Sequence, residues 1–178
     1  MVKLIGCVMA GNSEKYVELC LKALRPQVDY VVVCYDISSK DNTLRIIQNF
    51  LLKNTNVFYI EREYEHDLNV KNANSNQRNF YLDFLKERFP DDWCICLDAD
   101  EVVDDTLVNL KRLFKGFEEN NVTVLSPIME HFIGDFSHVD NTRDRHVVLN
   151  RVFKITSDLF YPDGEHPVLR SNADKKTV

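Results

Sequence analysis

The chain has 178 residues, of which 44% are hydrophobic, so it is long and apolar enough to form one compact domain around a buried core. It carries 28 acidic and 22 basic residues, which gives a formal net charge of −6. This acidic balance argues against a nucleic-acid binder or a protein held on an anionic membrane surface. No apolar run approaches the roughly 20 residues that span a bilayer, and no signal-peptide pattern opens the chain. We therefore expect a cytoplasmic protein without a transmembrane segment.

The cysteines lie in apolar patterns rather than at metal-ligand spacing. There are five of them: Cys7, Cys20, Cys34, Cys94 and Cys96. Only one residue separates Cys94 from Cys96, which is too short for a zinc knuckle. We predict reduced thiols in the core, as is usual for a cytosolic protein with an odd number of cysteines.

Apolar runs and amphipathic segments alternate along the first two thirds of the chain. Strands are predicted at residues 3–10, 30–35, 57–60, 93–97 and 122–129, and helices at 14–24, 43–52, 76–89 and 106–117. Ser13 is the expected N-cap of the first helix, and Trp93 is expected to be a core residue rather than a sugar platform. Alternating strands and helices predict an α/β fold with a doubly wound, mainly parallel sheet.

The last third of the chain has a different pattern. Residues 130–146 are rich in charges and show little periodicity, whereas 147–155 and 159–161 are predicted to be short strands in an antiparallel C-terminal part. We expect residues 1–170 to form a single domain. Residues 171–178 are almost without apolar side chains, so we expect a flexible tail or a linker to a further domain.

Polar and acidic residues follow three of the predicted strands, where ligands of open α/β sheets bind. They are Asn12 and Glu14 after the first strand, Asp36, Ser39 and Asp41 after the second, and Asp98 and Asp100 after the fourth. None of these loops has the GxGxxG dinucleotide fingerprint or the GxxxxGKS/T phosphate loop. An edge this acidic would repel a diphosphate unless a cation lay between them.

The Asp98-Ala99-Asp100 turn offers a way to hold such a cation. One carboxylate of the pair would reach a hard divalent cation, and the other a ribose hydroxyl or a metal-bound water. The ion would neutralise charge on a departing phosphate. A surface turn without a ligand is the alternative, because the pattern is common by itself.

Four ordered motifs resemble family 2 inverting glycosyltransferases of the GT-A fold. The first two are MAGNSEKYVELCLKAL and VDYVVVCYDISSKDNT, in which Ser38 replaces the Gly of the family's D-x-G-S-x-D-x-T loop. The third is Gln77-Arg78-Asn79 followed by DDWCICLDADEVV, which is similar to the family's RN and LDADE segments. The fourth is NRVFK followed by YPDGEH, which is similar to its R-x-F-R and G-x-H-E segments. The resemblance covers about residues 3–169, and Pro167 stands where the family often has Glu.

The resemblance implies a metal-dependent transferase of the GT-A fold. It would move a sugar, with inversion, from a nucleotide-diphosphate sugar, UDP-linked in many relatives, to a hydroxyl of a glycan, protein or lipid-linked acceptor. Asp36 would bind the base, Arg78 would help to hold the nucleotide, and Asp98 would lie near the ribose and the metal. Asp100 would be the main metal ligand, and His166 would complete the Mn²⁺ or Mg²⁺ site.

The general base and the acceptor site are less constrained by the sequence. Glu165 is the first candidate for the base that deprotonates the acceptor hydroxyl, and Asp135 is the second. The alternative for each is an ordinary solvated carboxylate without a catalytic role. The chain is shorter than most family members, so its acceptor-binding part would be either minimal or completed by a further domain or chain. Two alternatives remain open: a nucleotide-sugar-binding module without turnover, and a nucleotidyltransferase, which ordinarily has a basic Gly-rich loop after the first strand.

Overall fold

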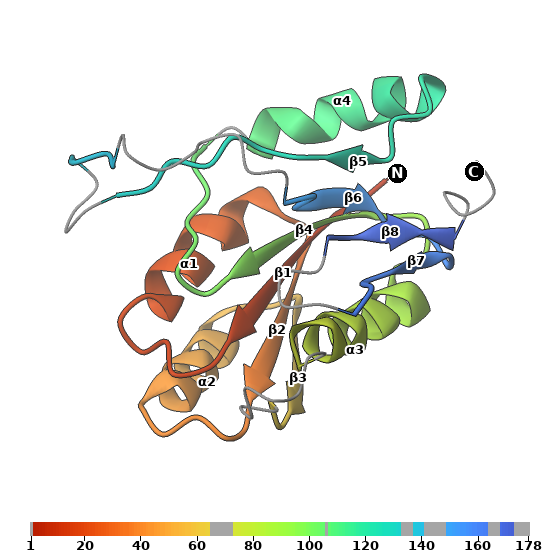
Figure 1. Cartoon of the computed structure of the whole chain (residues 1–178). Coiled ribbons are helices and arrows are strands. Elements are labelled where there is room, and N and C mark those ends of the chain that lie inside the picture. Colours follow the sequence, from red (N-terminus) through yellow and green to blue (C-terminus); the bar gives the residue numbers. More distant parts are fainter. Residues whose placement is uncertain are drawn as a thin grey trace.

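A computed structural model describes residues 2–64, 73–105, 107–132, 137–140, 149–163 and 168–172 (Figure 1). The helices are α1 (Val17–Leu24), the short 3-10 helix η1 (Arg25–Gln27), α2 (Thr43–Lys53), α3 (Ala73–Arg88) and α4 (Leu107–Glu119). The strands are β1 (Leu4–Ala10), β2 (Tyr30–Asp36), β3 (Val57–Arg62), β4 (Trp93–Asp98), β5 (Val124–Leu125), β6 (Val152–Lys154), β7 (Leu159–Phe160) and β8 (Arg170–Ser171). No described helix has the length and apolar character to span a membrane.

Six of the strands form one mixed sheet in the order β3-β2-β1-β4-β6-β5. β1, β2, β3 and β4 are parallel, whereas β6 runs antiparallel to both β4 and β5. The register places Met9 beside Asp98 and Ala10 beside Tyr35. The carboxyl ends of β1, β2 and β4 therefore meet at one edge, and the predicted α/β fold with a mainly parallel sheet is confirmed.

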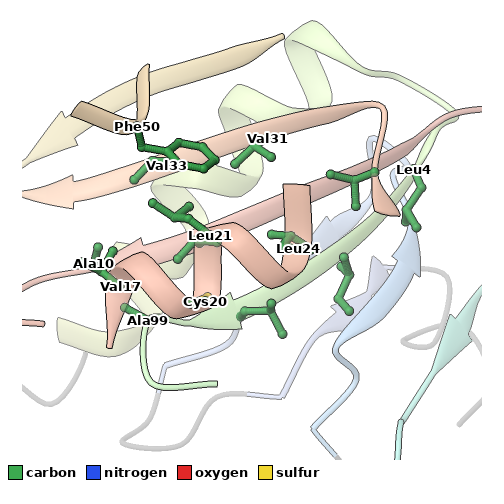
Figure 2. Close-up of a cluster of buried hydrophobic side chains, with 14 of the residues drawn as sticks. Leu4, Ala10, Val17, Cys20, Leu21, Leu24, Val31, Val33, Phe50 and Ala99 are labelled. Atoms are coloured by element: carbon green, nitrogen blue, oxygen red, sulfur yellow. The ribbon is translucent and has the colours of Figure 1, made fainter. Parts of the chain in front are cut away.

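Each face of the sheet carries its own hydrophobic core. Residues of α1, α2 and α4 pack on one face, where Val17, Leu21 and Leu24 point from α1 toward the strands (Figure 2). Residues of α3 and of the segment around β6 and β7 pack on the other face. A Cβ atom at Gly6 would lie 2.6 Å from Leu24 Cδ2, so the missing side chain lets α1 pack closely on β1.

Two local predictions about the core are confirmed. All five cysteines are buried free thiols. Trp93 is fully buried, and its ring stacks on Phe114 of α4 with a centroid distance of 4.5 Å. Trp93 is therefore a core residue that anchors α4.

Several predicted boundaries were wrong. The first helix begins at Val17 rather than after a Ser13 cap, because the Ser13 hydroxyl is hydrogen-bonded to the Gly11 backbone instead of to a helix amide. The fifth strand covers only Val124–Leu125, since Pro127 has no N–H to continue the ladder. The third helix begins at Ala73 rather than at residue 76.

The C-terminal strand at 147–155 is only partly confirmed. Within its described part, the strand covers Val152–Lys154 and is antiparallel, as expected. It lies inside the main sheet, between β4 and β5, rather than in a separate arrangement. β7 and β8 form the small antiparallel sheet next to it.

Candidate functional site

Two loops at the carboxyl edge of the sheet are joined by hydrogen bonds between them. The Asn12 N–H donates to Ser39 Oγ at 3.1 Å, and the Lys40 N–H donates to Asn12 Oδ1 at 2.8 Å. The Ser13 N–H donates to Thr43 Oγ1 at 2.7 Å. Asn12 adopts a positive φ of 47°, which asparagine tolerates better than most residues. The loop after β1 is therefore fixed to the loop after β2.

Glu14 and Asp41 complete this connection. The Glu14 N–H donates to Asp41 Oδ2 at 2.9 Å, and the N–H and side-chain amide of Asn42 donate to Glu14 Oε2 at 3.0 and 2.9 Å. Asp41 Oδ1 accepts from the Thr43 N–H at 3.0 Å. Both carboxylates thus serve the contact between the loops in this structure.

Asp36 ends β2 as a buried carboxylate with an exposed fraction of 5%. Its Oδ1 accepts hydrogen bonds from the Ser38 N–H at 3.0 Å, the Ser38 hydroxyl at 2.7 Å and the Tyr64 N–H at 3.0 Å. A Cβ atom at Gly11 would lie 2.9 Å from Asp36 Cβ, so only glycine lets the first loop approach this closely. The orientation of Asp36 is therefore set by backbone donors on one side and by Gly11 on the other.

A cleft of about 600 Å³ opens at this edge of the sheet. Five of the predicted site residues line it: Asn12, Asp36, Arg78, Asp98 and Asp100. Glu14, Ser39 and Asp41 do not line the cleft but join the loops beside it, so their contact with a nucleotide stays a prediction. The remaining three, Asp135, Glu165 and His166, lie outside the described residues.

Asp98 lies at the centre of an ion-pair network on the floor of the cleft. Arg78 Nη2 contacts its two carboxylate oxygens at 3.3 and 3.4 Å, and Arg151 Nη2 contacts Oδ2 at 2.8 Å. Arg151 Nη2 also donates to Glu101 Oε1, while the Asp98 N–H donates to Glu101 Oε2 at 2.9 Å. Glu101 therefore folds back over the turn that carries Asp100.

The network shifts the ionisation of both carboxyls, in opposite directions. Burial alone would raise the pKa of Asp98, but the two guanidinium groups hold that pKa below its usual range. Burial raises the pKa of Glu101 above its usual range, although Arg151 opposes this shift. The edge is less acidic than its three loops predict, because α3 brings Arg78 to it and the residue immediately before β6 is Arg151.

Asp100 is the exposed carboxylate of the turn, and it faces the cleft. Among the residues that the structure describes, its side chain has no hydrogen-bond or ion-pair partner, which leaves its oxygens open to a hard cation. Those residues contain no cluster of three His, Cys, Asp or Glu side chains that fits a metal ion. Asp100 could therefore supply one ligand to a cation, whereas the carboxylate of Asp98 is already paired with Arg78 and Arg151.

The sequence did not reveal Arg151 and Tyr161 as site residues. Arg151 stands in the NRVFK motif, but its contact with Asp98 spans 53 residues and no local pattern predicts it. The Arg78 guanidinium lies over the Tyr161 ring, 5.8 Å from its centroid. Asn79 pairs with the Tyr161 backbone through hydrogen bonds of 2.8 and 2.9 Å. The Arg-Asn pair of α3 therefore joins the cleft to the segment after β7.

Comparisons with known proteins agree with this architecture. The sequence model described as Glycosyl transferase family 2 matches residues 7–173, which include the whole described cleft. No curated protein matches the chain. The crystal structure of 4-diphosphocytidyl-2C-methyl-D-erythritol synthase is similar, with a TM-score of 0.52 and 15% identity over 87% of this chain and 76% of that chain. At this identity the likeness concerns the fold alone. The chain belongs to glycosyl transferase family 2 and has an α/β fold of the GT-A type.

Proposed function

We propose that this protein is a glycosyltransferase that uses a nucleotide-diphosphate sugar, most simply a UDP-linked one, and transfers the sugar with inversion to a hydroxyl of a glycan, protein or lipid-linked acceptor. One observation carries the proposal: a single cleft joins a fixed Asp36 at the end of β2 to the Asp98-Ala99-Asp100 turn at the end of β4. This arrangement at the carboxyl ends of two strands suits a ligand with a base at one end and phosphates at the other.

The proposed roles follow the chemistry of these side chains. Asp36 is an acceptor, which suits a base that presents a ring N–H. Arg78 and Asp98 would lie at the ribose and the first phosphate, and Asn12 lines the same cleft. Asp100, with His166, would hold Mn²⁺ or Mg²⁺. When bound, the cation supplies charge neutralisation at the departing diphosphate.

The acceptor hydroxyl needs a general base on the face opposite the leaving diphosphate. Glu165 is the first candidate and Asp135 the second, as the sequence predicts. We also propose that residues 1–170 form the catalytic domain and that a further domain or chain contributes to the acceptor site.

Thermal unfolding tests donor binding directly. The midpoint is measured with UDP, CDP, GDP and their sugars, each with Mn²⁺, Mg²⁺ or EDTA. A ligand at a hundred times its dissociation constant stabilises by about 2.7 kcal/mol, which raises the midpoint by several degrees. We expect UDP with Mn²⁺ to give the largest shift. No shift with any nucleotide, with or without metal, would contradict the proposal.

The role of Asp100 is tested by Asp100→Asn, measured as turnover of the donor that binds. Losing one oxyanion-type contact costs roughly 3 kcal/mol, or about a hundredfold in rate. Asp91→Asn is the matched control, because Asp91 is an exposed carboxylate before the other end of β4. Normal turnover in Asp100→Asn would refute its role as metal ligand.

Two other functions are separated by the products formed. A nucleotidyltransferase deserves comparison because two arginines line the cleft, and it would release pyrophosphate from a nucleoside triphosphate and a sugar phosphate. A glycosyltransferase would instead release a nucleoside diphosphate from a nucleotide sugar. A binding module without turnover would bind the donor and release neither product.

A further inference from the structure

We infer that Arg78 and Arg151 together form a seat for the diphosphate of the ligand, so that part of its binding needs no metal ion. This inference rests on the proposed function and deepens it, because it assigns a binding role to Arg151. We call Arg78 and Arg151 the arginine pair.

The arginine pair is held in place by a shared carboxylate. Both guanidinium groups contact Asp98, and both residues line the cleft. Their side chains are 16% and 8% exposed, so little water screens them. Two cations this close would repel each other without Asp98 between them, which gives that carboxylate a positioning role.

Arg151 has donors that no residue in the described part of the chain uses. A guanidinium carries five N–H groups, and the contacts to Asp98 and Glu101 both involve Nη2. Nε is buried without a hydrogen-bond partner among the described residues. Nη1 has no hydrogen-bond partner among those residues either, and because Arg151 lines the cleft, a ligand there that offers several acceptor oxygens would pair with this group. Phosphate groups offer these oxygens in a geometry that matches the guanidinium plane.

Arg78 is the member of the pair that is free to change partner. Its contacts with Asp98 are 3.3 and 3.4 Å long, whereas charge-assisted hydrogen bonds are usually about 2.7–2.9 Å. The contact from Arg151 to Asp98 has that shorter length, 2.8 Å. A diphosphate would therefore draw Arg78 away from Asp98 and leave Arg151 as the fixed side of the seat. Asp98 would then be available to a ribose hydroxyl or a cation.

The test is titration calorimetry in EDTA with two probes, UDP and inorganic pyrophosphate. Wild-type protein is compared with Arg151→Lys and Arg78→Lys, which keep the charge beside Asp98 but remove the planar fork. Arg112→Lys is the matched control on the exposed side of α4. We expect both probes to bind the wild type and the control equally. Each cleft variant should bind about tenfold more weakly, as expected for one charge-assisted hydrogen bond.

Thermal unfolding without ligand separates this role from a purely structural one. A structural ion pair predicts that Arg151→Lys changes the unfolding midpoint and leaves the affinity of the folded protein unchanged. If Arg151→Lys does not fold, Arg78→Lys gives the same comparison at the more exposed, weaker pair. No binding of either probe in EDTA, or equal affinity in wild type and the folded cleft variants, would overturn the inference.

Failure of the inference and failure of the proposed function give different results. If wild type and Arg151→Lys bind nucleotide equally well with Mn²⁺ and neither binds it in EDTA, the inference about the arginine pair is refuted. The proposed transferase function is then unaffected. Binding of pyrophosphate that depends on the arginine pair, without any nucleotide binding, keeps the seat and removes the proposed donor.

Discussion

At the scale of single residues, two glycines make a matched pair of tests. At Gly11 a Cβ atom would meet Asp36 Cβ at 2.9 Å and Oδ2 at 3.1 Å, whereas at Gly116 it would meet nothing within 4 Å. We expect Gly11→Ala to lower the free energy of unfolding by about 1–3 kcal/mol, as overpacking does, and to weaken nucleotide binding. Gly116→Ala, in the interior of α4, should raise it by roughly 0.5–1 kcal/mol.

Urea unfolding and titration with UDP measure both effects. Since Asp36 is expected to bind the base, Gly11→Ala should lose affinity even at temperatures where it is fully folded. Unchanged affinity in Gly11→Ala would mean that the position of Asp36 has no bearing on the ligand.

The ion-pair network also has a structural role that a single substitution exposes. Arg151→Met would leave Glu101 and Asp98 without their shared cation, and breaking a buried pair costs about 3–5 kcal/mol. We expect about 3 kcal/mol, the lower end, because the Asp98 side chain is 34% exposed. Lys22→Met is the comparison, since its pair with Glu18 is exposed on α1 and should be worth less than about 0.5 kcal/mol. Equal losses in urea unfolding would contradict this account.

Site residues differed in how far the sequence could predict them. Asp36 and Asp98 each end a buried strand and Asp100 follows one, and the parallel register brings all three to one cleft, as expected. Glu14 and Asp41 follow the same rule, yet their carboxylates join two loops. Position after a strand predicts the edge of the sheet but not the direction of a side chain.

At the scale of elements, Asp29 connects the start of β1 to α4. Its carboxylate accepts from the Leu4 N–H at 2.8 Å and from Lys111 Nζ at 2.6 and 2.7 Å. Burial alone would raise the pKa of Asp29, but these donors hold it below its usual range. Asp29 is therefore a pH-dependent link between two elements.

The sign of this pH dependence follows from the lowered pKa. The stabilisation is complete above the unfolded-state pKa of about 3.9 and is lost as the pH falls through the folded-state value. Near neutral pH we expect the free energy of unfolding of the wild type to exceed that of Asp29→Asn by roughly 0.5–1 kcal/mol. The difference is small because the ion pair between Asp29 and Lys111 is partly exposed. Urea unfolding from neutral pH downward measures the difference, which should shrink below about pH 4. A difference that stays constant across this range would show that ionisation is not involved.

Whether an element was predictable depended on its length and its neighbours. β1, β2 and β4 are strands of six or seven residues, apolar throughout except for the final Asp of β2 and β4, and they lie within a residue or two of the expected bounds. β5 has two residues and β6 three, so periodicity cannot define them. The position of β6 beside β4 depends on pairing across the whole chain, which no local pattern contains.

At the scale of the whole molecule, the last third of the chain completes the structure rather than extending it. β6 pairs with the outer edge of β4, and the segment from Phe153 to Tyr161 covers the same face of the sheet as α3. Phe153 and Ile155 are fully buried, and Tyr161 is 5% exposed. Burial of each such side chain contributes about 1.5–3 kcal/mol. Removal of these three side chains would therefore cost much of the roughly 5–15 kcal/mol by which a typical domain is stable.

We therefore expect a chain truncated after Leu125 to lose cooperative unfolding. Without β6 the edge of β4 lacks its partner, and Tyr81, Leu82 and Leu85 of α3 lose the apolar residues packed beside them. Far-UV circular dichroism and Trp93 fluorescence should give one coincident thermal transition for the full chain and none for the truncated one. Truncation after Asn172, which retains β8, is the control and should keep the transition. A cooperative transition in the shorter chain would mean that residues 1–170 are not one domain, and that the arginine cleft joins two separable parts.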